Sequence, residues 1–205
     1  MLCSRGWFFF TALCLLILCA ALPLHAQSEA TGQVKAVLDK AMDIQTRPEL
    51  QGTGHRKERS VQIRKLIAEN FMSAEMARES LPDHWDKLSG GQRQQYQELF
   101  SGLFQDSYTR MVLDFLKRET VEFPGESPEG KSVKVRTIIM RTNEHIPVDY
   151  ILDRKGQRWL IRDVIIDGVS IVDNYKNTFG SFIRKQSFDA LLQRMRIQKK
   201  AGEDT

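Results

Sequence analysis

The sequence predicts an α+β domain in which N-terminal helices pack on a curled antiparallel sheet and C-terminal helices follow. Apolar residues recur at helical spacing from about residue 33 to residue 118 and alternate with polar residues from 120 to 166. Helical spacing returns after residue 170. Helices followed by a meander of strands are typical of α+β folds, in which helices cover one face of an antiparallel sheet.

The N-terminal segment has the pattern of a secretory signal peptide. Arg5 precedes an uncharged apolar run from Trp7 to Leu22, and Pro23-Leu24-His25-Ala26 then leads to the polar Gln27. The run is short for a bilayer span and no cluster of Lys and Arg follows it, which disfavours a retained anchor. We therefore expect residues 1–26 to be cleaved and residues 27–205 to form a single domain.

All three cysteines, Cys3, Cys14 and Cys19, lie in the segment that we expect to be removed. The mature chain then has no disulfide, no cysteine metal site and no cysteine nucleophile. The whole chain is mildly basic, with a formal net charge of +4. An exported protein is not expected to bind nucleic acid. Its charge fits anionic headgroups, an acidic partner, or solubility alone.

Three helices are predicted in the first part of the chain. One spans residues 33–50 and is closed by Pro48, and a second spans residues 56–71. A third, short helix starts near Ser73 and is broken around Pro82.

A long helix then opens at Ser89, where Gln92 completes a capping box, and runs to about Arg118. Its apolar stripe contains Tyr96, Leu99, Phe100, Leu103, Phe104, Ser107, Met111 and Phe115. Tyr108, Val112 and Leu116 widen the stripe in the last turns. A stripe this broad must be covered on two sides.

The strands follow with a period of two. Val121 and Phe123 predict a short strand, and the Pro- and Gly-rich residues 124–130 predict a loop. Alternation over 133–140 and 146–153 predicts two neighbouring antiparallel strands joined by a short turn. Residues 159–166 are predicted to be the last strand of the sheet.

That last strand carries two adjacent charges, Arg162 and Asp163. Strict alternation places them on opposite faces, and both faces are otherwise mostly apolar, so both sides of the strand are predicted to be covered. An unpaired buried ion costs several kcal/mol, roughly, so each charge needs a partner. For Asp163 we favour hydrogen bonds from turn amides or a nearby Lys or Arg. The alternatives are a role in shaping a cavity and a catalytic carboxylate.

Two helices are predicted after the strands. The first is capped by Ser170 and Asp173, and the second buries Phe188, Leu191, Leu192 and Met195. Six cations flank this last helix, namely Arg184, Lys185, Arg194, Arg196, Lys199 and Lys200. They form either a solvated face or a surface that docks to membrane complexes.

The order of these landmarks resembles the MlaC family of periplasmic phospholipid-binding shuttle proteins, also called toluene-tolerance auxiliary proteins, with hopanoid-associated relatives. The residues that carry the resemblance are the segments 71–78 and 84–93, Tyr108, Trp159, Asp163, the segment 168–170, Tyr175 and Phe179. One departure is Gly90-Gly91, where relatives more often have a Pro-Glu pair.

The resemblance implies a nuclear-transport-factor-like cone with an apolar cavity, so that residues 27–205 are one lipid-binding domain. It implies a non-enzymatic periplasmic carrier that moves phospholipid between an inner-membrane ABC transporter complex and an outer-membrane lipoprotein complex, maintaining outer-membrane lipid asymmetry. We expect a monomer with phospholipid as its ligand, no cofactor and no metal. Acyl chains are predicted to contact Leu103, Tyr108, Val112, Val135, Val148, Tyr150, Ile161 and Phe179. A close-packed core would use the same residue types.

Two other functions stay open. A small cavity enzyme acting on a lipid or isoprenoid would use Asp149, Asp163, Tyr108 or Tyr150 as acid and base. However, the chain has no Gly-x-Ser-x-Gly elbow, phosphate loop or His-Glu-x-x-His motif, and its mature histidines share no ligand spacing, so no catalytic residue is predicted. A non-catalytic scaffold that bridges envelope proteins is the second alternative.

Overall fold

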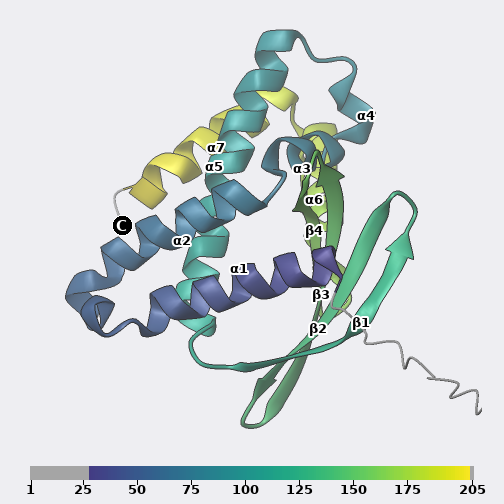
Figure 1. The fold of residues 1–205 in the computed structure, drawn as a ribbon. Helices are drawn as coiled ribbons and strands as arrows, with labels where there is room; N and C mark the ends of the chain where they lie inside the picture. The colour runs from purple at the N-terminus through teal and green to yellow at the C-terminus, as the bar shows by residue number, and fades with distance from the viewer. Residues whose placement is uncertain (1–27, 204–205) are drawn as a thin grey trace, which may run out of the picture.

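The computed structural model describes residues 28–203 and confirms the α+β fold class (Figure 1). The expected signal peptide lies outside these residues. Helices α1, α2, α5 and α7 lie to one side of an open five-stranded sheet.

The first helices follow the predicted order. They are α1 (Glu29–Thr46), the 3₁₀ turns η1 (Pro48–Leu50) and η2 (Thr53–His55), α2 (Arg56–Asn70), α3 (Ser73–Glu79) and α4 (Pro82–Trp85). Helix α1 begins before residue 33 because the Ser28 hydroxyl caps it, accepting from the Thr31 amide at 3.2 Å. It ends at Thr46 because the residue before Pro48 is restricted to extended conformations.

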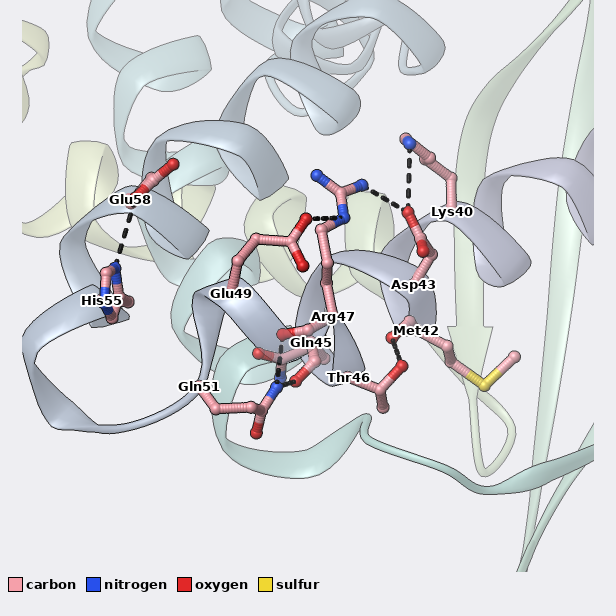
Figure 2. Close-up of polar contacts among 10 residues, drawn as sticks. All are labelled: Lys40, Met42, Asp43, Gln45, Thr46, Arg47, Glu49, Gln51, His55 and Glu58. Atoms are coloured by element: carbon pink, nitrogen blue, oxygen red, sulfur yellow. Dashed lines mark hydrogen bonds and ion pairs between the residues drawn. The ribbon is translucent and has the colours of Figure 1, made fainter.

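The end of α1 is held by side chains on two sides. On the exposed side, the Asp43 carboxylate accepts from Lys40 at 3.2 Å and from Arg47 at 2.5 Å (Figure 2). The hydrogen bond from Arg47 holds the pKa of Asp43 below its usual value. On the buried side, the Gln45 amide reaches α5 (Gly90–Phe115), where it donates to three backbone carbonyls, those of Val112, Leu113 and Leu116, at 2.8, 3.0 and 2.9 Å.

Helix α5 starts as predicted and ends early. The Gln92 amide donates to the Ser89 hydroxyl at 3.2 Å and the Ser89 amide donates to Gln92 Oε1 at 2.9 Å, which confirms the capping box. The helix ends at Phe115 rather than near Arg118. The last carbonyls of a helix lack intrahelical partners, and here Gln45 supplies donors to them.

The sheet is an antiparallel meander in the order β1-β2-β3-β4-β5. Its strands are β1 (Thr120–Glu129), β2 (Ser132–Arg141), β3 (Glu144–Lys155), β4 (Arg158–Ile166) and β5 (Val169–Ser170). The short β5 extends the sheet beyond the strand that we predicted to be its last.

The predicted loop over 124–130 is wrong, because β1 continues through it to Glu129. Pairing with β2 shifts by one residue between Glu122 and Gly125, which is a β-bulge. The strand lies at the edge of the sheet, where proline is tolerated although it lacks an N–H group. Pro124 and Pro128 therefore do not end the strand.

Strict alternation along β4 is also wrong. Leu152 pairs with Ile161 but Ile151 pairs with Asp163, so Arg162 is an extra residue in a second bulge. The bulge turns Ile161 and Val164, which are 0% and 6% exposed, to the same side. The remaining side chains of β4 are half-buried or exposed, so the predicted burial of both faces is only partial.

Helices α6 (Ile171–Lys185) and α7 (Phe188–Glu203) complete the fold. Ser170 caps α6, accepting from the Asp173 amide at 3.0 Å. Of the four residues predicted to be buried in α7, Leu191, Leu192 and Met195 are confirmed, whereas Phe188 is only half-buried. They pack with the fully buried aromatic rings of α5 in one core.

Candidate functional site

An apolar cavity of about 250 Å³ lies between the sheet and helices α1, α2 and α5. The helices contribute Val37, Leu38, Ala41, Ile63, Leu66, Ile67, Tyr108, Met111, Val112, Phe115 and Ile171, and Phe71 adds a ring. The sheet contributes Ile139, Arg141, Ile146, Val148, Tyr150, Val164 and Ile166. Leu116 closes the lining after the end of α5.

Four of the predicted lipid contacts lie in this lining. Tyr108 and Val112 come from α5, and Val148 and Tyr150 come from β3. Val148 and Tyr150 point to one side because they are two residues apart in a strand. The structure thus brings residues about 40 positions apart in the sequence into one wall.

The other four lie elsewhere. Val135 pairs with Tyr150 across the sheet and Ile161 pairs with Leu152, and both are 0% exposed core residues outside the lining. Leu103 and Phe179 line a second hollow of about 590 Å³ between α5, α6 and α7. That hollow also contains polar residues, among them Arg110, Asn174 and Arg194.

The contributions of α1 and α2 were missed by the sequence analysis. Their apolar positions were recognised, but periodicity does not distinguish a face that fills a core from one that borders a cavity. The pair Ile139 and Ile146 had a usable signal, because the short turn between β2 and β3 fixes their pairing. Arg141 gave no such signal in the sequence, because a single cation at the end of a strand is common.

The interior of the cavity is uncharged. Burial raises the pKa values of Tyr108 and Tyr150 well above that of free tyrosine, so both phenols are neutral at physiological pH. The nearby Tyr175 and Asp163 raise the pKa of Tyr108 further. Arg141, at the end of the lining, is the single charged residue among those that border the cavity in the described part of the chain.

The charged pair of β4 is engaged by structural contacts, although the buried Nε of Arg162 has no hydrogen-bond partner within residues 28–203. The Asp163 carboxylate accepts from the amides of Val164 at 2.8 Å and Val172 at 3.1 Å and from the Ser170 hydroxyl. Backbone amides thus hydrogen-bond to Asp163, but they belong to strand β4 and to the first turn of α6 rather than to the turn that we predicted. The Arg162 guanidinium pairs with Glu79 at 3.3 Å and with Asp153 at 3.4 Å, and it donates to Ser132.

Of the four residues considered as acid and base for an enzyme, Tyr108 and Tyr150 line the cavity, whereas the two carboxylates do not. Asp149 pairs with Arg136 in the sheet register and points away from the cavity, since it alternates with Val148 and Tyr150. Asp163 is engaged by backbone amides. Within residues 28–203 no group of three or more His, Cys, Asp or Glu side chains is placed to hold a metal ion.

The helices of the described segment are also too short or too polar to cross a bilayer.

Comparison with known proteins gives a consistent result. The family model described as MlaC protein matches residues 35–197. The toluene tolerance protein ttg2D of Pseudomonas putida is 23% identical over 124 residues, which is 60% of this chain and 54% of that protein. The intermembrane phospholipid transport system binding protein MlaC of Haemophilus influenzae is 22% identical over 120 residues, 56% of each chain. The chain thus spans just over half the length of these curated relatives.

Among solved structures, the phospholipid-binding protein from Ralstonia solanacearum in complex with a phospholipid has a similar fold. The TM-score is 0.72 with 21% sequence identity, covering 86% of this chain and 99% of that one. At this identity the likeness concerns the fold.

Proposed function

Because the chain belongs to the MlaC family, we propose that it is a phospholipid carrier that holds acyl chains in the cavity between sheet and helices. The observation that carries the proposal is the chemistry of the lining, which is apolar apart from two neutral phenols and one guanidinium at its end. Apolar clefts with few polar groups are the usual form of lipid and small-molecule sites.

The energetics of transfer require such a chamber. Removing one methylene from water is worth about 0.8 kcal/mol, so a chain with a dozen buried carbons gains roughly 10 kcal/mol. A bare lipid therefore leaves a bilayer very slowly. A chamber as apolar as the bilayer makes the transfer nearly isoenergetic, and direction then comes from the partners.

We also propose in which compartment the chain works and with which complexes it exchanges lipid. The chain would be exported, lose residues 1–26 and work in the periplasm as a monomer. There it would exchange phospholipid between an inner-membrane ABC transporter complex and an outer-membrane lipoprotein complex, and so maintain outer-membrane asymmetry. The relative named for intermembrane phospholipid transport supports exchange between membranes, and the structure solved with a phospholipid supports phospholipid as the ligand.

Tyr108, Val112, Val148 and Tyr150 are proposed to contact the acyl chains directly, because they line the cavity. For Leu103, Val135, Ile161 and Phe179 we propose contact only where a longer or second chain displaces neighbouring side chains. No catalytic residue, cofactor or metal is part of the proposal.

The test is lipid extraction combined with cavity filling. Val112→Trp and Val148→Trp each place an indole in the cavity, whereas Val61→Trp adds one at a position of α2 that is 60% exposed. If an indole displaces about three methylenes, retention falls about fiftyfold. Mass spectrometry of the extract measures intact lipid per protein for each variant.

We expect intact phospholipid in the wild type and in Val61→Trp, and strong loss in the two filled variants. Equal lipid content in all four proteins would show that the cavity is not the site. Recovery of chemically altered lipid would indicate an enzyme, and wild-type protein without lipid would favour a scaffold.

A further inference from the structure

The apolar cavity ends at a single guanidinium, that of Arg141 on β2. The same side chain borders a separate open hollow of about 550 Å³, lined by polar and charged residues of the α5–β1 connection and the β2–β3 turn. Arg141 therefore lies between an apolar chamber and a hydrated one. A ligand that occupied both would be apolar at one end and polar at the other.

Contacts with the end of α5 fix the position of the Arg141 side chain. Its Nη2 donates to the Phe115 carbonyl, and the guanidinium carbon lies 5.6 Å from the centroid of the Phe115 ring. Glu119 Oε1 lies 3.6 Å from Nη2. The side chain of Arg141 is 28% exposed and Phe115 is 58% exposed, so this end of the cavity is open to solvent.

Much of the donor capacity of Arg141 is unused. A guanidinium has five N–H donors, and the contacts within residues 28–203 engage only Nη2. Nε and Nη1 remain for a ligand at the mouth. A planar fork of N–H groups matches the oxygens of a phosphate better than a point charge does.

The surrounding charges favour an anion. Lys117 and Arg118 line the open hollow, are exposed, and have no carboxylate partner in the described part of the chain. Glu119 and Glu144 line it too. Glu119 is already engaged, since it faces Arg141 and accepts from the Lys117 amide. Three cations against two carboxylates leave the mouth positive.

We propose that Arg141, with Lys117 and Arg118 beside it, binds the phosphate of the phospholipid whose acyl chains fill the cavity. This inference rests on the proposed carrier function and adds selectivity to it: the site distinguishes phosphate-bearing lipids from neutral lipids with the same chains. Arg141 is thus a specificity residue, and Glu119 is a competitor for its guanidinium that a phosphate must partly displace.

The experiment compares two lipids with identical chains, phosphatidylglycerol and diacylglycerol, each carrying a fluorescent acyl chain and presented in phosphatidylcholine vesicles. Transfer to lipid-depleted protein is measured for the wild type, Arg141→Gln, Glu119→Gln and Arg136→Gln. Arg136 is a matched control on the same strand that is exposed and donates to Ser127. Charge-assisted hydrogen bonds predict a preference of about ten- to hundredfold for the phosphate lipid.

We expect Arg141→Gln to remove this preference, because uptake of phosphatidylglycerol falls about ten- to hundredfold more than uptake of diacylglycerol. Glu119→Gln should increase phosphatidylglycerol uptake, and Arg136→Gln should match the wild type. If the Arg141–Glu119 pair were only structural, both substitutions would reduce uptake of both lipids, which would overturn the inference. Unchanged selectivity in Arg141→Gln would overturn it too, with the carrier function intact.

Failure of the wild type to take up either lipid would instead contradict the proposed function. A last arm titrates the wild type and Arg141→Gln with soluble glycerol phosphate by calorimetry. Arg141-dependent binding of this anion without acyl chains, at affinity equal to that for the lipid, would identify a free-anion site and overturn the assignment to a lipid headgroup.

Discussion

Replacing Asp163 by alanine tests why a strand of the sheet contains a carboxylate. In the native protein this carboxylate joins the bulge of β4 to the start of α6, because it accepts from the amides of Val164 and Val172. Both of these residues are only 6% exposed, so water does not readily replace the lost acceptor. An unsatisfied buried donor costs about 1–3 kcal/mol, and two donors give about 2–6 kcal/mol.

The assay is urea unfolding followed by circular dichroism, on lipid-depleted protein. With a slope of about 2 kcal/mol/M, we expect the midpoint of Asp163→Ala to fall by roughly 1–3 M. Asp163→Asn keeps one acceptor oxygen and should lose only about 1 kcal/mol. Asp149→Ala, on the neighbouring strand, should stay within about 0.5 kcal/mol of the wild type.

A loss below about 1 kcal/mol in Asp163→Ala would refute this account of the bulge. Equal losses in the alanine and asparagine variants would show that the charge matters rather than the acceptor atoms.

Three further outcomes are expected. Gln45→Ala should destabilise the fold by about 1–3 kcal/mol in the same assay, because three carbonyls at the end of α5 lose a buried donor, whereas exposed Gln94→Ala should not. All four tyrosines have pKa values raised mainly by burial, so their stabilising contribution is complete below pH 10 and is lost as the pH rises further. An ultraviolet titration should therefore show tyrosinate appearing only with unfolding, and a phenol that ionises normally in folded protein would contradict this. Removing bound lipid should lower the melting temperature, because a ligand that binds only the folded state stabilises it, by about 2.7 kcal/mol at a free concentration one hundred times the Kd; identical melting of loaded and stripped protein would argue against occupancy.

The features that the sequence predicted well are those that periodicity determines. The long helix α5 was recognisable because its stripe repeats over many turns and its capping box marks the start. Strands β2 and β3 alternate regularly, and the short turn between them fixes their pairing.

The features that were missed depend on spatial context. A bulge adds one residue to a strand without changing its composition. Strict alternation was therefore continued past Ile161, and the residues of β4 beyond it were assigned to the wrong faces of the sheet. The proline-rich part of β1 was read as a loop, because a sequence does not reveal that a strand lies at an edge.

For the same reason, about half of the predicted site residues were placed correctly from the sequence. Tyr108, Val112, Val148 and Tyr150 belong to elements whose apolar faces were clear, and they do line the cavity. The walls from α1 and α2 depend on how these helices cross the sheet. Arg141 acquires its position only when β2 ends against the last turn of α5.

The proline-containing border of the sheet has a consequence for handling the protein at high concentration. Two of the ten positions of β1 lack an amide hydrogen, a bulge interrupts its line, and the hydroxyls of Ser28 and Thr31 cover Glu126. An incoming strand from a second copy would find no continuous ladder to extend. The β1 edge of the sheet is thereby guarded against strand pairing between two copies of the chain.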